Sequence, residues 1–310
     1  MTNPTIDHFD HPLFHHKDLI LITPAMEKLK NDLLQLLWND GTGALAYGMS
    51  RVGKTRALEI MTPQLTTRAG LPIPHYYVMI SQRDQKTIAS IHRNICINYG
   101  LRETNRDRAD YLANRFVHFI AERADECGCE EALLIVDEFQ RLNLFQLDAF
   151  EELQDKCLTL DINLVVLFVG IDPECWPLVE QIEKPRNAHI RGRFFTEGIE
   201  FKGLTSQADV EACLSEYDRL HFPNEGVSYA EFFTEKGWKL KSLSRDLWRV
   251  YREDFKTTYK INSWPMKYFV TTVKILLTDF LYQHGVNACC DEMLRGAIDA
   301  SKLIPSLTKQ

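Results

Sequence analysis

The sequence lacks three features that mark membrane, secreted and zinc-binding proteins. No run of apolar residues approaches the roughly 20 that a helix needs to cross a bilayer, and the N-terminal segment 1–10 holds neither a basic cluster nor the apolar stretch of a secretory signal. The eight cysteines include no C-x-x-C pair, so buried or free thiols in a reducing compartment are predicted instead of a structural zinc site. We therefore expect a cytoplasmic protein.

An excess of positive charge is also missing. The 310 residues hold 36 Lys and Arg against 43 Asp and Glu, which gives a formal net charge of −7. This argues against a highly basic, non-specific nucleic-acid binder, although a local basic surface can still contact DNA. A composition of 45% hydrophobic and 25% charged residues predicts one large or two modest globular domains. The early histidines follow no ligand pattern and are interpreted as surface residues: His8, His11, His15 and His16.

What the chain does contain is a complete phosphate-binding motif, G-x-x-x-x-G-K-[ST], at residues 48–55. Its glycines permit a tight turn whose N–H groups point into one anion-sized hollow. We expect Lys54 to reach the β- and γ-phosphates of ATP and Thr55 to bind Mg²⁺. A chance match is disfavoured because a buried strand is predicted at 43–47 and a helix at 55–61, with its N-terminus toward the phosphates. The candidate cofactor-binding residues here are Gly48, Ser50, Arg51, Val52, Gly53, Lys54, Thr55 and Arg56.

A second motif supplies acidic groups. The apolar run 132–136 predicts a buried parallel strand and ends in Asp137 and Glu138. Asp137 is predicted to support Mg²⁺ and Glu138 to act as the base that polarises the attacking water; a solvated acidic turn is the alternative. The apolar stretch 164–171 ends in Asp172, which fits a γ-phosphate sensor or, equally well, a helix cap.

Arginines near the predicted nucleotide complete the list of catalytic candidates. Within a basic cluster, Arg191 or Arg193 is predicted to reach the γ-phosphate held by a neighbouring subunit and to stabilise transition-state charge. A solvated basic loop is the competing interpretation. Arg245 begins a helix that Ser244 is expected to cap, and would contact the nucleotide from a lid or form surface ion pairs.

The order of elements predicts an α/β fold with a parallel sheet, crossover helices and a helical C-terminal region. We expect three regions: an N-terminal lead-in at 1–24, the α/β core at 25–204, and a C-terminal helical lid and partner-binding region at 205–310. The expected strands are 43–47, 75–80, 132–137 and 164–171. The expected helices are 25–39, 55–61, 84–98, 106–126, 147–158, 206–220, 228–236, 243–254 and 264–283.

Together the motifs resemble AAA+ ATPases, and more narrowly the TnsC/TniB family of ATP-dependent transposition regulators, over about residues 20–205. The resemblance rests on the phosphate loop, on Leu134-Ile-Val-Asp-Glu-Phe-Gln-Arg-Leu142, on Val166-Leu-Phe-Val-Gly-Ile-Asp172 and on Arg191-Gly-Arg-Phe194. The family implies a P-loop AAA+ core with a C-terminal helical lid, Mg²⁺-dependent ATP hydrolysis and assembly as a ring or filament. Ile171 departs from relatives that carry a polar sensor residue at its position.

The resemblance also implies partners. Such proteins assemble on double-stranded DNA without reading its sequence and link a target-selecting complex, with a TniQ-type adaptor, to the transposase; shorter members work with CRISPR-associated systems. The residues carried over as DNA-binding are Arg83, Lys86, Thr87, Thr104, Asn105 and Arg106. Lys and Thr can contact phosphates without base readout, although Thr104 would serve equally as a cap of the 106–126 helix.

Two other functions are compatible with the same nucleotide residues. A helicase loader or origin-binding ATPase would differ only in its partners. A nucleotide-gated signalling switch of the STAND type would assemble through protein contacts and never touch DNA, and the negative net charge slightly favours it. That switch would show no DNA stimulation and no salt-sensitive DNA binding.

Overall fold

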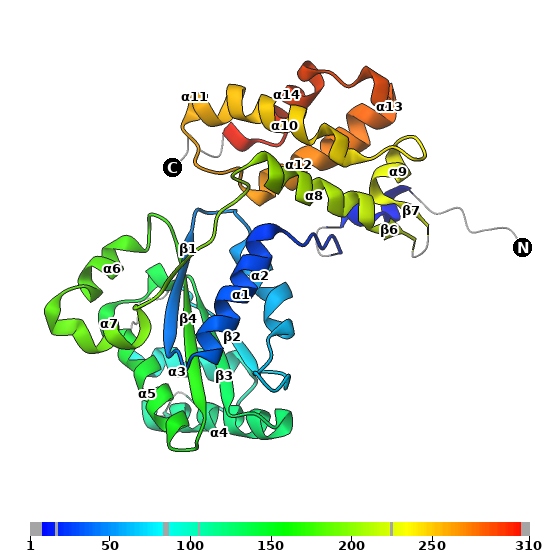
Figure 1. Cartoon of the computed structure of the whole chain (residues 1–310). Helices are drawn as coiled ribbons and strands as arrows, with labels where there is room; N and C mark the ends of the chain where they lie inside the picture. The colour runs from blue at the N-terminus through cyan, green and yellow to red at the C-terminus, as the bar shows by residue number, and fades with distance from the viewer. Residues whose placement is uncertain (1–7, 16–17, 83–86, 105, 224–225, 305–310) are drawn as a thin grey trace, which may run out of the picture. The chain divides into compact units, whose positions relative to one another are not determined.

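The computed structural model describes residues 8–15, 18–82, 87–104, 106–223 and 226–304. These residues form two compact units, which are described separately (Figure 1). The sheet unit comprises residues 28–50 and 54–201. The helical unit comprises the described residues among 1–27, 51–53 and 202–310.

The sheet unit is built on a five-stranded, wholly parallel sheet in the order β2-β3-β4-β1-β5. Its strands are β1 (Gly43–Gly48), β2 (His75–Met79), β3 (Glu131–Asp137), β4 (Asn163–Ile171) and β5 (Gly198–Glu200). The central strands β3 and β4 are buried along almost their whole length. Continuous apolar runs form such strands because helices cover both faces of a parallel sheet.

Alternate residues of the strands pack on opposite faces of the sheet. On one face, Leu134, Val166 and Phe168 join a core with Phe116 of α4 and Phe150 of α5. The intervening strand residues point to the other face, and Figure 1 shows helices on both sides of the sheet. The helices of this unit are α1 (Pro24–Trp38, apart from its first turn), α2 (Lys54–Met61), α3 (Ile88–Asn98), α4 (Ala109–Cys127), α5 (Asp148–Leu158), α6 (Trp176–Ile182) and α7 (Ala188–Phe194).

Two helices of the sheet unit begin three or four residues later than the sequence predicts. Helix α3 begins at Ile88 because Thr87 and Ser90 form a reciprocal capping box there; residues 84–86 of the expected helix lie outside the described residues. Helix α4 begins at Ala109 and not at residue 106, and its N-cap residue, Arg108, makes no side-chain cap. The predicted α/β fold with a parallel sheet and a helical C-terminal region is nevertheless confirmed.

The helical unit has its own aromatic core, in which the rings of Tyr251 and Trp264 stack with centroids 4.1 Å apart. Its helices are α8 (Gln207–Arg219), α9 (Tyr229–Phe233), α10 (Ser244–Val250), α11 (Thr257–Tyr259), α12 (Met266–Ile275), α13 (Tyr282–His284) and α14 (Asp291–Ala300). Two π-helical segments, Tyr251–Lys256 and Leu276–Leu281, continue α10 and α12. A two-stranded antiparallel ribbon joins β6 (His221–Phe222) to β7 (Val227–Ser228).

Two expectations for this unit are wrong. His11 is fully buried instead of exposed, and its ring lies 4.6 Å from Tyr229 and 4.8 Å from Phe233. Ser244 is the first residue of α10 and not its cap; the capping position is Leu243, whose side chain has no acceptor for a cap. Among the described helices, none is both long and apolar enough to span a bilayer.

Candidate functional site

The carboxyl ends of three neighbouring strands bring the predicted nucleotide residues to one edge of the sheet. Strand β4 lies between β1 and β3. Gly48 at the end of β1 is in register with Ile171 of β4, and Asp137 at the end of β3 with Val169. Because ligands of parallel sheets bind at this edge, the topology places the phosphate loop and the acidic motif side by side.

The lysine of the phosphate loop donates hydrogen bonds to the backbone of the same loop. The ammonium of Lys54 donates hydrogen bonds to the carbonyl oxygens of Gly48 (2.6 Å) and Met49 (2.9 Å). A Cβ at residue 48 would lie 2.1 Å from the carbonyl oxygen of Phe201, so only glycine fits, and Gly53 has a φ of +102°. Burial lowers the pKa of Lys54, and the nearby carboxylate of Asp137 opposes that shift. The loop therefore holds a partly desolvated cation where a phosphate would bind.

Thr55 and Asp137 form a pair of oxygen donors suited to Mg²⁺. The Thr55 hydroxyl donates to Oδ2 of Asp137 at 2.9 Å, and Asp137 is buried. Hydroxyl and carboxylate oxygens are the hard ligands that Mg²⁺ takes beside phosphate oxygens and water. These two residues therefore fit the metal that the motif predicts.

Sequence reasoning missed Tyr77 of β2, whose hydroxyl also donates to Oδ2 of Asp137. Burial, together with this hydrogen bond to the carboxylate, raises the pKa of Tyr77 well above its usual value. Tyr77 therefore remains a neutral donor that helps to fix the orientation of Asp137. No motif signals this role, because the tyrosine lies 60 residues from its partner and within an ordinary strand pattern.

Glu138 follows β3 in the left-handed conformation, with φ 62° and ψ 40°. Its Oε2 accepts a hydrogen bond from Nε2 of Gln140 at 3.0 Å and lies 2.9 Å from Nη2 of Arg141. Arg141 also donates from Nη1 to the carbonyl of Ile80, the residue after β2, at 2.9 Å. The predicted base is therefore engaged by two side chains of its own loop, which belong to the motif that carries the family resemblance but were assigned no role from the sequence.

The remaining loop residues make local contacts. Arg51, which belongs to the helical unit, has a φ of 66° and donates to the hydroxyl of Tyr268 in the same unit. Val52 is buried and Ser50 half-buried. Arg56 pairs with Glu59 at 3.1 Å along α2.

Asp172 does not cap the helix that follows it. Its Oδ1 accepts a hydrogen bond from the indole of Trp176 at 2.7 Å, whereas the N-cap of α6 is Cys175. The backbone N–H of Asp172 donates to the carbonyl of Gly48, which places it beside the phosphate loop. Arg245 lies on the exposed side of α10 in the helical unit.

The two candidate trans-acting arginines of α7 differ in their surroundings. Arg193 is held by α5: its Nη1 lies 2.6 Å from Asp155 and its Nε 3.4 Å from Glu151. Arg191 makes one longer contact, 3.5 Å, with the exposed carboxylate of Glu183. Of the two, Arg191 has the greater freedom to reach another molecule.

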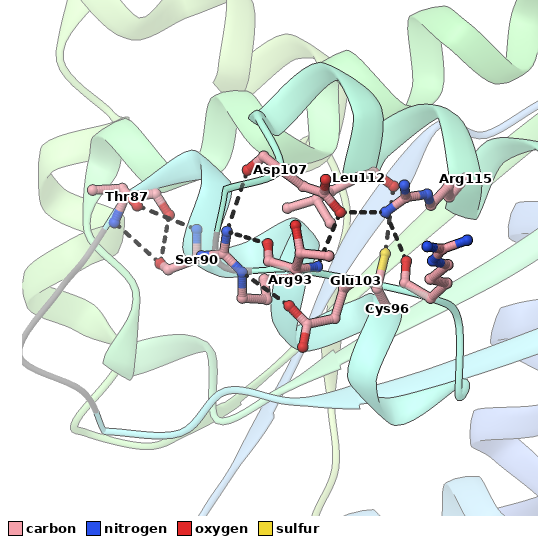
Figure 2. Close-up of polar contacts among 10 residues, drawn as sticks. Thr87, Ser90, Arg93, Cys96, Glu103, Asp107, Leu112 and Arg115 are labelled. Atoms are coloured by element: carbon pink, nitrogen blue, oxygen red, sulfur yellow. Dashed lines mark hydrogen bonds and ion pairs between the residues drawn. The ribbon is translucent and has the colours of Figure 1, made fainter.

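Three of the predicted DNA-binding residues lie among the described residues, at the start of α3 and in the α3–α4 connection. Figure 2 labels one of them, Thr87. The Thr87 hydroxyl oxygen accepts from the N–H of Ser90 at 3.2 Å, which is a capping contact. Thr104 does not cap α4; its N–H donates to Oδ2 of Asp107 at 3.0 Å. Arg106 is exposed. Arg83, Lys86 and Asn105 lie outside the described residues.

Comparison with known families agrees with this geometry. Residues 40–179 match the family described as "AAA domain", a stretch of less than half of the chain. It contains β1 with the phosphate loop and β3 with Asp137 and Glu138. The site therefore lies within a stretch that is similar to AAA-type P-loop ATPase domains. No curated protein matches the chain.

The solved structures that match this chain share little of its sequence. The Walker-type ATPase PABY2304 of Pyrococcus abyssi is 15% identical, with 79% of this chain and 73% of that chain covered and a TM-score of 0.43. PCH-2 of C. elegans is 10% identical, with 92% and 71% covered and a TM-score of 0.41. Drosophila ORC bound to DNA is 14% identical, with 92% and 68% covered and a TM-score of 0.45.

Proposed function

We propose that this AAA-type ATPase domain hydrolyses Mg²⁺–ATP and that the chain is an ATP-dependent, DNA-binding regulator of transposition. The observation that carries the ATPase proposal is the convergence of Lys54, Thr55 and Asp137 at one edge of the sheet. In this proposal Lys54 binds the phosphates, Thr55 and Asp137 hold Mg²⁺, and Glu138 accepts the proton of the attacking water. The bound metal would neutralise charge that develops on the phosphates.

The regulatory part of the proposal rests on the motif resemblance to TnsC/TniB proteins. ATP bound at a subunit interface, with Arg191 of the neighbour near the γ-phosphate, would favour an assembly on double-stranded DNA. Hydrolysis would remove the γ-phosphate contacts and loosen that assembly. The assembled form would link a TniQ-type adaptor to the transposase.

The DNA part draws support from exposed cations in the α3–α4 connection. Arg102, Arg106 and Arg108 all face solvent, although the chain as a whole is acidic. Clustered arginines can contact phosphates without reading sequence. The net charge of −7 favours the alternative, a signalling switch that assembles without DNA.

One experiment tests these alternatives. ATPase rate and particle size are measured with and without double-stranded DNA, for the wild type, Lys86→Ala and Arg106→Ala. DNA-stimulated turnover and assembly, reduced in both variants, are expected. Thr87→Ala joins the series with Thr87→Ser as its control, since serine keeps the α3 cap. Assembly and turnover indifferent to DNA would overturn the regulator proposal in favour of the signalling switch.

A further inference from the structure

In the connection between α3 and α4, the basic side chains face solvent and the acidic side chains are half-buried. We name residues 102–104 and 106–108 the arginine loop. Arg102, Arg106 and Arg108 are exposed, whereas the two acids of the loop, Glu103 and Asp107, are half-buried. Among the described residues, none makes an ion pair or side-chain hydrogen bond with the three exposed guanidinium groups. The outward side of the loop is therefore cationic.

Two arginines of the flanking helices hold the acids in place. Arg93 of α3 places its Nε 3.3 Å from Glu103, and its Nη2 donates to the carbonyl oxygens of Thr104 (3.3 Å) and Asp107 (3.2 Å). Arg115 of α4 donates from Nη1 to Oδ2 of Asp107 at 2.5 Å and to the carbonyl of Arg102 at 2.7 Å. Figure 2 shows both guanidinium groups turned toward the loop.

Asp107 is the centre of this arrangement. Its Oδ2 accepts from both Arg115 and the backbone N–H of Thr104, and its own N–H donates to the carbonyl of Thr104 at 3.0 Å. The hydrogen bond from Arg115 holds the pKa of Asp107 below its usual value. The carboxylate is therefore charged at neutral pH and closes a tight turn in the loop.

We propose that Arg93, Asp107 and Arg115 are positioning residues that fix the arginine loop so that its outward arginines meet the phosphates of double-stranded DNA together. This inference rests on the DNA binding proposed above and names the groups that make the surface. A loop ordered beforehand loses less conformational freedom when it binds. Three cations on an unfixed loop would bind phosphates more weakly, although the charge would be unchanged.

The direction in which one substitution changes DNA affinity distinguishes a positioning role from a purely electrostatic one. Removing a carboxylate from a DNA-binding surface raises affinity, because repulsion of the phosphates falls. Positioning predicts the opposite for Asp107→Asn, because the neutral amide turns the charge-assisted hydrogen bond from Arg115 into a weaker one. We expect DNA affinity, measured by fluorescence anisotropy with ATP present, to fall about tenfold. Asp110→Asn, which removes the same charge from an exposed residue in the first turn of α4, is the matched control and is expected to bind slightly more tightly.

Arg115 gives a second readout. If it acts through Asp107, then Arg115→Gln weakens binding, and the double variant with Asp107→Asn binds no more weakly than the weaker single variant. Arg115→Lys, which keeps a cation within reach of Asp107, should restore part of the affinity. Additive losses would show that Arg115 contacts DNA itself and would overturn the positioning role.

The outcomes of this test are distinct. Wild-type protein that binds no DNA at low salt would refute the proposed function and the inference with it. Wild-type binding together with tighter or equal binding by Asp107→Asn would refute the inference alone. ATP affinity and melting temperature serve as folding controls. Should Asp107→Asn fail to fold, the Arg115→Lys and Arg115→Gln pair decides, because equal affinity in the two variants and the wild type also refutes the inference.

Discussion

The carboxylate of Glu138 and the guanidinium of Arg141 lie 2.9 Å apart, three residues along the same loop. Glu138 is the side chain expected to activate water, yet Arg141 and Gln140 already occupy one of its oxygens. An oxygen that already accepts hydrogen bonds from two side chains has less capacity left to accept one from water. The two residues therefore compete with the attacking water for this oxygen.

The role of Glu138 is tested by Glu138→Gln. The amide keeps the size of the side chain but cannot accept a proton, so ATP turnover is expected to fall by about 10²- to 10⁴-fold while ATP binding persists. Assemblies should also last longer, because the γ-phosphate stays in place. Steady-state turnover and nucleotide-binding titrations check both effects. Normal turnover would remove Glu138 from the catalytic residues.

Removal of the ion pair between Glu138 and Arg141 should speed ATP hydrolysis. We expect Arg141→Ala to raise ATP turnover without DNA by up to about fivefold, the size of a partly exposed ion pair. Arg141→Lys keeps the cation and is expected to stay near the wild-type rate. A fall in turnover for Arg141→Ala, with ATP affinity unchanged, would instead mean that Arg141 supports Glu138 in the reaction.

The hydroxyl of Tyr77 should affect the use of Mg²⁺. Tyr77→Phe removes a donor from Asp137, and loss of such a supporting contact weakens metal binding by about 10- to 100-fold. We expect the Mg²⁺ concentration at half-maximal turnover to rise accordingly. Tyr76→Phe is the matched control, because the buried Tyr76 hydroxyl has no hydrogen-bond partner among the described residues. Equal Mg²⁺ dependence in the two variants would argue against the role of Tyr77.

Arg191 and Arg193 can be separated by mixing subunits. A Lys54→Ala subunit is expected not to bind ATP, but its α7 still carries Arg191. Such a subunit can therefore supply the trans-acting arginine to a neighbouring Arg191→Ala subunit that binds ATP. Turnover by Arg191→Ala alone should fall about 10³-fold or more if the arginine acts in trans, and mixing should restore part of it. Arg193→Ala is expected mainly to lower the melting temperature, because Arg193 ties α7 to α5. Failure of mixing to restore any turnover would exclude the trans role of Arg191.

The sequence predicts the fold and the core of the site because both depend on local signals. The apolar runs before Gly48 and Asp137 are long enough to identify buried strands, and parallel strands end at a common edge. The phosphate motif places Lys54 and Thr55 by spacing alone. The parallel sheet and the contact of Thr55 with Asp137 follow from these signals.

Contacts between residues that lie far apart along the chain could not be predicted from the sequence. Tyr77 is 60 residues from Asp137, and the burial of His11 depends on rings more than 200 residues away. Contacts between residues so far apart leave no periodic pattern in the sequence from which they could be predicted. Capping side chains also compete with helix propensity. Thr87 and Ser90 cap α3 at a point where propensity alone predicts more helix. A capping side chain outcompetes such propensity because it satisfies backbone N–H groups that the helix leaves unpaired.

The arginine loop also changes how the charge of this chain should be counted. A formal total weighs Glu103 and Asp107 equally with Arg102 and Arg106, and so describes the loop as nearly neutral. Both acids, however, are already matched by Arg93 and Arg115 within the fold. An approaching polyanion would meet guanidinium groups whose countercharges face away from it. The pairing of side chains, and not the sum over the sequence, therefore sets the sign of the field at this surface.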